Sequence, residues 1–221
     1  MTREPFLRTR AGRLALLAML LIDIFVIPVL MTLAVVPMRA GDLFFAGTML
    51  VAMAAMGMGS GRRLILALAL AAFVIQFFRF ADGSHVLVAL DASLSALALG
   101  TFAAMVLVDV FRQDPTADRL IDVILAYLLV GAMYASIYEA VNVALPGSLT
   151  LDGGDVTPVG YVYFSFTTMT SVGYGDALPM HPVSRAIAMG QALTGQLYVA
   201  VLIARYVSPQ RRAEPLDGGA G

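Results

Sequence analysis

The sequence predicts an all-α membrane protein with six transmembrane helices. Hydrophobic residues make up 60% of the 221 residues and charged residues only 13%, whereas soluble domains carry about 25% charged residues. Crossing a bilayer takes roughly 20 apolar residues, and six apolar stretches approach or exceed that length. They lie at 14–36, 43–58, 64–80, 86–111, 120–145 and 183–207.

Local breaks set the limits of these stretches. The second and third are short, but the Gly-Ser-Gly-Arg-Arg run at 59–63 separates them too sharply for one helix. The first follows four arginines, yet its apolar run exceeds the ~7–15 residues of a signal peptide. We therefore expect a retained helix, kinked at Pro28. A seventh segment, 161–170, is too short to span and is expected to be a re-entrant helix buried within protein.

The basic residues orient the chain, because all fourteen are arginine and most fall on one side. With both termini inside, the outer side holds only Arg39, Arg79 and Arg185. The inner side holds Arg3, Arg8, Arg10, Arg13, Arg62, Arg63, Arg112, Arg119, Arg205, Arg211 and Arg212. This excess follows the positive-inside rule. Residues 1–12 and 208–221 are then cytoplasmic ends, and the segment after 161 approaches from the outer side.

Composition also argues against several functions. The chain has no cysteine and only two histidines, His85 and His181, which disfavours thiolate and histidine metal centres. No basic stripe suited to nucleic acid is present. No pairing of nucleophile and base is recognisable. We expect no enzyme activity, no cofactor and no small-molecule substrate.

Residues 167–176 carry the strongest functional signal and read TTMTSVGYGD. Gly173 and Gly175 can adopt positive φ at little steric cost, which Val172 and Tyr174 cannot. Alternating backbone dihedrals would aim successive carbonyls in one direction. Neutral carbonyl oxygens can replace the hydration shell of a monovalent cation without trapping it.

This segment resembles the selectivity filter of potassium channels. The resemblance implies K⁺ as the permeant ion and a homotetramer, since four strands must form the ring of oxygens. It assigns the filter to Ser171, Val172, Gly173, Tyr174 and Gly175. Residues 118–207 then form the pore domain of that superfamily, in the order helix, Gly- and Asp-rich turret (146–158), pore helix, filter and inner helix.

The same resemblance extends into the last helix. Gly195 falls at the hinge glycine of the inner helix of simple bacterial potassium channels. Close helix packing is an equally good explanation of Gly195, and Gly190 could also serve as the hinge. The resemblance implies that the inner pore is lined by Gln196, Val199, Ile203 and Val207.

The chain also departs from this family. Ser171 stands where the family usually has threonine. Serine keeps the hydroxyl group of threonine but lacks its methyl group. Where the family often carries tryptophans and an acidic residue in the pore helix, this chain has Tyr163, Phe164 and Thr167. We therefore expect the Tyr163 hydroxyl to brace Asp176 behind the filter, with Thr170 also in support.

Glu139 stands near the outer end of the fifth helix. In six-helix potassium channels a glutamate there often ties the pore loop to the helix. An interfacial carboxylate that extends to the bilayer surface is an equally good explanation.

Residues 13–111 are expected to form a four-helix transmembrane domain without a voltage sensor. Voltage sensors carry a series of arginines in the fourth helix, and the stretch 86–111 contains none. Intramembrane charges are costly and usually paired, so we expect Arg79 to meet Asp91. Asp23 is either a gating or proton-sensing site or, as we favour, bonded to a neighbouring helix.

Together these features predict a potassium-selective channel subunit without strong voltage gating, in the plasma (inner) membrane of a bacterium. Two alternatives remain open. One is a weakly selective cation channel, and the other is a non-conducting accessory membrane subunit.

Overall fold

The computed structural model describes residues 10–37, 47–48, 67, 70–71, 74–75, 84–112, 114–116 and 119–207. Most of the second and third predicted stretches, 43–58 and 64–80, lies outside the described residues. So do Arg39, Arg79 and both chain ends. The predicted Arg79–Asp91 pair therefore stays a prediction, as does the count of six spans.

Four helical spans in the described part are long and apolar enough to cross a membrane. The first, Arg10–Thr32, combines α1 (Arg10–Leu21), a π-helical turn η2 (Ile22–Val26) and α2 (Ile27–Thr32). Three more follow: α5 (His85–Arg112), α6 (Leu120–Ala144) and α8 (Pro182–Val207). Their limits agree with the predicted stretches to within one residue. The chain is therefore a multi-pass membrane protein.

The first span differs from its prediction in two ways. Pro28 has no amide to donate to the preceding turn, and the backbone adjusts through η2 just before it. The helix also ends at Thr32, four residues earlier than the predicted limit of 36. Ala34 follows with φ of 56°, a left-handed conformation that a helix cannot continue.

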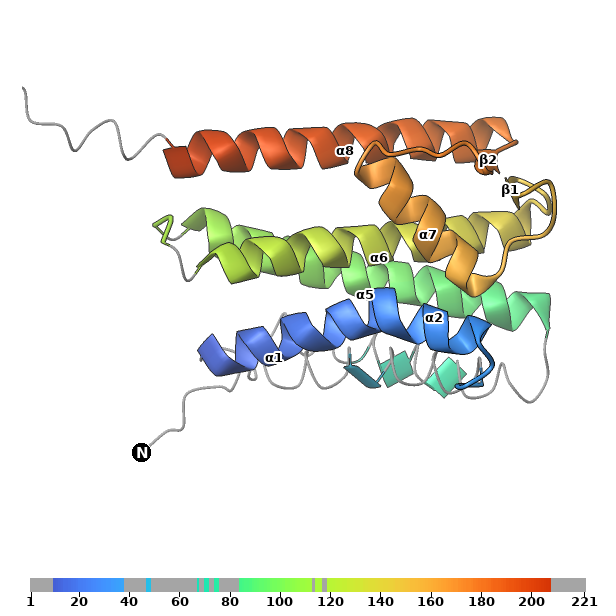
Figure 1. The fold of residues 1–221 in the computed structure, drawn as a ribbon, viewed down its shortest axis with the longest axis horizontal. Coiled ribbons are helices and arrows are strands. Elements are labelled where there is room, and N and C mark those ends of the chain that lie inside the picture. The colour runs from blue at the N-terminus through green and yellow to red at the C-terminus, as the bar shows by residue number, and fades with distance from the viewer. Residues whose placement is uncertain are drawn as a thin grey trace, which may run out of the picture.

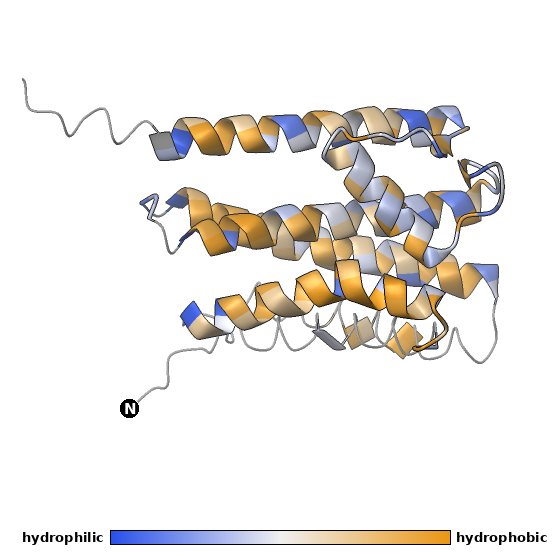
Figure 2. Cartoon of the chain, viewed as in Figure 1, coloured by the Kyte–Doolittle hydropathy of each residue, from blue (hydrophilic) through white to orange (hydrophobic). Residues whose placement is uncertain are grey.

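The four spans run in alternating directions (Figure 1). The start of α1, the end of α5, the start of α6 and the end of α8 lie at one end of the bundle, and the two short strands lie at the other. Arg10, Arg112, Arg119 and Arg205 stand at or near those helix ends. Figure 2 shows the spans as mainly apolar, with hydrophilic residues near their ends.

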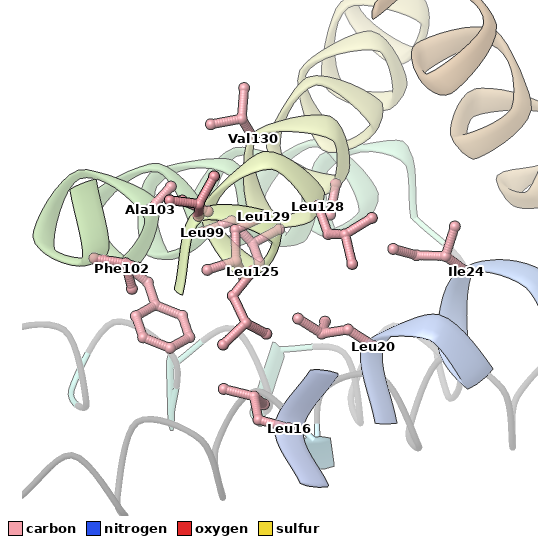
Figure 3. Close-up of a cluster of buried hydrophobic side chains, with 14 of the residues drawn as sticks. Leu16, Leu20, Ile24, Leu99, Phe102, Ala103, Leu125, Leu128, Leu129 and Val130 are labelled. Atoms are coloured by element: carbon pink, nitrogen blue, oxygen red, sulfur yellow. The ribbon is translucent and has the colours of Figure 1, made fainter. Parts of the chain in front are cut away.

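The apolar core lies where α1, α5 and α6 meet (Figure 3). Leu20, Leu99 and Leu129 are almost completely buried there. Small residues allow α5 and α6 to approach closely, as is usual between membrane helices. A Cβ atom on Gly100 would lie 2.8 Å from the Met133 sulfur. α5 therefore packs against α6, the first helix of the predicted pore module.

The predicted re-entrant helix is present as α7 (Pro158–Met169). It begins three residues before the predicted limit, because Thr157 caps it by accepting a hydrogen bond from Gly160 N, and Pro158 suits its first turn. α7 lies between α6 and α8, starts at the end that carries the strands, and stops partway along the bundle (Figure 1). The chain then returns along α8 toward the end where it entered.

A small sheet corrects the prediction of a purely helical fold with a loop turret. β1 (Leu149–Leu151) pairs antiparallel with β2 (Ala177–Pro179), with Thr150 opposite Leu178. Alternating leucine and threonine suit a strand, but the partner lies beyond the filter segment. The sheet ties the turret to the exit of that segment.

Candidate functional site

The backbone of residues 171–175 alternates in handedness. Ser171, Gly173 and Gly175 have φ values of 59°, 48° and 86°, whereas Val172 and Tyr174 do not have positive φ. The left-handed conformation is easy for glycine and less strained for serine than for β-branched threonine. Ser171 was not expected in this conformation. The left-handed conformation gives a physical reason for serine rather than threonine at this position.

Two consecutive amides of this segment point back at the pore helix. Val172 N and Gly173 N both donate to the Thr167 carbonyl, at 2.9 and 3.2 Å. No peptide bond in the described part is cis, and in a trans peptide the carbonyl points opposite to the amide that follows it. The carbonyls of Ser171 and Val172 therefore both point away from α7.

Tyr163 and Asp176 hold the C-terminal end of the segment against α7. The Tyr163 hydroxyl donates to Asp176 Oδ2 at 2.6 Å, the pair that the sequence singles out. The Tyr163 ring also stacks on Tyr174, with centroids 6.4 Å apart and planes 3° from parallel. The hydroxyl lowers the pKa of Asp176, and the same bond raises the pKa of Tyr163 to about 12.

Thr167 and Thr170 support the segment through their backbone. The Thr167 hydroxyl bonds back to the carbonyls of Tyr163 and Phe164, while its own carbonyl receives the amides described above. The Thr170 hydroxyl likewise donates to the Phe166 carbonyl, at 2.7 Å. Both side chains thus stabilise the end of α7.

The N-terminal end of the segment meets α8. Gln196 Nε2 donates to Ser171 Oγ at 2.8 Å, and both residues are exposed. Val199 and Ile203 continue along α8 and are also exposed, and Val207 is the last residue of the helix. The sequence places Gln196 on the inner pore but gives no sign of its contact with Ser171.

Gly195 lies where α8 crosses the end of α7. A Cβ atom there would come within 2.1 Å of the Met169 carbonyl oxygen, so only glycine permits this approach. At Gly190, by contrast, a Cβ atom would meet nothing within 4 Å. Of the two explanations of Gly195, this contact favours close packing, and Gly190 is the glycine whose surroundings leave room to bend.

A buried polar network joins the three helices of the pore module, and the sequence did not reveal it. Gln191 Nε2 donates to the Ser165 carbonyl and hydroxyl at 3.0 and 2.7 Å, and Gln191 Oε1 accepts from the Tyr138 hydroxyl at 2.7 Å. Ser165 Oγ in turn donates to the Gly131 carbonyl at 2.6 Å. All these side chains are almost fully buried. A glutamine within an otherwise apolar stretch of α8 is the signal that could have found it.

Asn142 connects the turret to the pore helix. Its Nδ2 donates to the Tyr161 hydroxyl at 2.8 Å, and its Oδ1 accepts from Leu149 N and the Ser148 hydroxyl. The sequence suggested Glu139 for such a tie. Glu139 lies one turn earlier on α6 and lines a cavity together with Pro158 and Tyr161, so its tethering role stays a prediction.

Comparison with known proteins shows what this part of the chain is similar to. Residues 122–209 match the family described as Ion channel. Two pore potassium channel c of Oryza sativa subsp. japonica is 33% identical over 86 residues, which are 38% of this chain and 17% of that protein. The inward rectifier potassium channel Kirbac3.1 of Paramagnetospirillum magnetotacticum is 31% identical over 91 residues, which are 38% of this chain and 28% of that protein. Residues 122–209 are therefore similar to the two-helix pore module of ion channels, including these two potassium channels.

The matched region of this pore module contains α6, α7, the filter segment and α8, so the two-helix arrangement expected from the sequence is confirmed. The matched family and both relatives are channels, which supports a channel rather than an enzyme. The chain spans less than a third of either relative. No solved structure matches it significantly.

Proposed function

We propose that this chain is one subunit of a homotetrameric, potassium-selective channel. The observation that carries the proposal is the common direction of the Ser171 and Val172 carbonyls, away from α7. Four copies around an axis would turn these oxygens into stacked rings. Rings of neutral carbonyls can replace the hydration shell of K⁺ and still release it.

The charge distribution suits rapid passage of a monovalent ion. Residues 171–175 carry no ionisable side chain except Tyr174. The nearest carboxylate, Asp176, is held by Tyr163 and by its bond to Ala177 N. A carboxylate inside the filter would bind cations more tightly than conduction allows. The selected ion would thus meet backbone oxygens, with Asp176 serving as a structural brace.

Surfaces left open on one chain support assembly into a tetramer. Val172 and Tyr174 are 51% and 73% exposed although both are apolar or aromatic. The polar pair Gln196 and Ser171 is exposed as well. Polar groups at membrane depth belong next to protein or water rather than lipid. In a tetramer, neighbouring subunits would cover Val172 and Tyr174. A water-filled axis lined by α8 from four subunits would surround Gln196 and Ser171.

We also propose that the channel is not strongly voltage-gated. α5 carries no arginine before Arg112 at its end, so this helix lacks the series of arginines on which the membrane field acts in voltage sensors. The arginine distribution supports cytoplasmic termini, and the all-arginine, alanine-rich composition supports the plasma (inner) membrane of a bacterium as the location.

Reversal potentials of the purified full-length protein in planar bilayers test the function. With opposing K⁺ and Na⁺ gradients, a reversal close to the K⁺ equilibrium potential is expected. An intermediate value would instead favour a weakly selective cation channel, for which the replacement of threonine by Ser171 is the structural reason. Absence of current under all conditions would favour an accessory subunit.

Two glycine variants separate loss of the filter from loss of the fold. Gly175→Ala places a side chain at φ 86° in the filter, and Gly153→Ala does the same at φ 76° in the turret, with no crowding at either site. We expect Gly175→Ala to abolish K⁺ selectivity and Gly153→Ala to retain it. Equal selectivity in the two variants would contradict the proposal.

A further inference from the structure

The end of α8 reaches α5, a helix that lies outside the region matched to ion channels. We call residues 196–207 of α8 the C-terminal arm. We propose that Arg205 holds this arm against α5 and thereby keeps the pore open where the arms of four subunits line it. The effect on conduction rests on the proposed function, whereas the position of the arm can be measured without it.

The C-terminal arm is loosely packed within its own subunit. Gln191 and Gly195, just before it, are buried, whereas none of residues 196–206 is. The half-buried residues of the arm recur every three to four positions, so they lie on one face of the helix. They are Tyr198, Leu202, Arg205 and Tyr206. Because little apolar surface is buried here, polar contacts carry more of the attachment to the bundle.

Arg205 contacts the end of α5 in two ways. Its Nη2 donates to the Val110 and Phe111 carbonyls, at 3.0 and 3.1 Å. Its guanidinium carbon also lies 5.2 Å from the centroid of the Phe111 ring, which is within the range of a cation–π contact. The last four carbonyls of a helix have no partner inside the helix, and the negative end of the helix dipole lies there. A guanidinium group is therefore well suited to this position.

The contact joins two parts of the chain with different roles. Arg205 and Val110 are 95 positions apart in the sequence. α8 belongs to the matched region, whereas α5 precedes it and shares the apolar core with α1 and α6. A change in the position of α5 is therefore transmitted to the C-terminal arm through Arg205. The helices before the matched region thus gain a direct route to the helix proposed to line the pore.

The exposed residues of the arm set the direction of the effect. Val199 and Ile203 are 48% and 58% exposed, and in the proposed tetramer four copies of each face the axis. Apolar side chains that gather at the axis bury surface from water, and such a constriction closes a pore by dewetting. Arg205 opposes this movement because it holds the arm against its own subunit. Loss of Arg205 should therefore favour the closed pore.

Distances between two spin labels test the contact in the full-length protein in lipid nanodiscs. The chain has no cysteine, so Val108→Cys and Ala204→Cys place one label near the end of α5 and one on the arm, both at exposed positions. Excess unlabelled chains ensure that each assembly carries one labelled subunit. We expect Arg205→Gln to lengthen the mean distance by about 5 Å. Even a tilt of about 20° that begins only at Gly195 moves position 204, ~14 Å along the helix, by that amount.

Two further variants complete the distance measurement. Arg185→Gln is the matched control, because Arg185 also lies on α8 but donates to the Pro179 carbonyl, and its distance should stay unchanged. Phe111→Leu removes the ring beside the guanidinium and leaves the carbonyls, so it should give a smaller shift in the same direction. An unchanged distance in Arg205→Gln would show that Arg205 only caps α5, and would overturn the proposal. If Arg205→Gln does not fold, an unchanged distance in Phe111→Leu would overturn it.

Single-channel records of chains without labels test the effect on conduction. Arg205→Gln should lower the open probability about tenfold, which corresponds to loss of a hydrogen bond to a charged group, and should leave the reversal potential unchanged. An equal or higher open probability would overturn the role of Arg205 in keeping the pore open. Absence of current from the unaltered chain would instead contradict the proposed function, while the distances would still decide whether Arg205 holds the arm.

Discussion

The Tyr163 hydroxyl and the Asp176 carboxylate are joined by a 2.6 Å hydrogen bond that links the pore helix to the residue directly after the filter. The same tyrosine ring stacks on Tyr174. One side chain therefore restrains the filter at two points. The hydrogen bond and the ring contact can be separated, because phenylalanine keeps the ring and removes the hydroxyl.

Tyr163→Phe should speed or slow the decay of current during sustained opening. The hydroxyl is removed from Asp176 while the stacking on Tyr174 remains, so the outer end of the filter loses one of its two restraints. Single-channel and ensemble currents in planar bilayers measure the change. Tyr134→Phe is the matched control, because its hydroxyl forms only a 3.4 Å contact with Thr194. If the current of Tyr163→Phe decayed at the same rate as that of the unaltered chain, the hydrogen bond from Tyr163 to Asp176 would not restrain the filter.

The pH dependence of this pair follows from its two shifted pKa values. The pKa of Asp176 lies below 3.8, so its contribution is present above 3.8 and is lost as pH falls through the lowered value. The pKa of Tyr163 rises from 10.0 to about 12, so its contribution is present below 10.0 and is lost as pH rises through about 12. The difference in decay rate between the unaltered chain and Tyr163→Phe should therefore be constant between about pH 5 and pH 9. A difference that disappears within this range would show that another group controls the brace.

Tyr138→Phe should destabilise the folded module. The change leaves Gln191 Oε1 buried without the hydroxyl that donates to it, and a buried unsatisfied acceptor costs about 1–3 kcal/mol. Bonds between membrane helices lie toward the low end of that range. Thermal unfolding in detergent should show a lower midpoint for Tyr138→Phe than for Tyr134→Phe. Equal midpoints would mean that Gln191 finds another donor.

Gly195→Ala and Gly190→Ala distinguish packing from bending. A Cβ atom at Gly195 would overlap the Met169 carbonyl, and overpacking costs about 1–3 kcal/mol. Gly190→Ala meets no neighbour and should gain about 0.5–1 kcal/mol of helix stability. We expect Gly195→Ala to lower the unfolding midpoint and K⁺ flux.

Gly190→Ala should keep the fold, and any change in its open probability would mark Gly190 as the hinge. Open probability comes from single-channel records at fixed voltage, with unfolding measured on the same preparation. A normal unfolding midpoint and normal flux in Gly195→Ala would contradict the packing explanation.

Features that depend on short sequence segments were predictable. The described spans follow from runs of apolar residues, and α7 follows from a short apolar run that begins near a Thr-Pro pair. The filter segment follows from two glycines spaced two apart, since their conformational freedom is a property of the residue itself. Even the Tyr163–Asp176 pair lies within thirteen residues along the chain.

Features that join distant segments were missed. β1 pairs with β2 across the whole pore helix and filter, and nothing in the turret identifies its partner. Tyr138 and Gln191 are separated by 53 residues, so their bond depends on how α6 and α8 cross. The close approach at Gly195 likewise depends on where α7 ends against α8.

Composition and local order alone were therefore enough to establish a multi-pass membrane protein and to predict a glycine-containing ion filter, because hydrophobic length and backbone freedom belong to individual residues and their neighbours. Three-dimensional packing had to supply the rest: the hydrogen-bonded network at Gln191, the contact of Gln196 with Ser171, and the contact of Arg205 with the end of α5. These arise from the angles and distances at which helices meet, and a linear order of residues does not specify either.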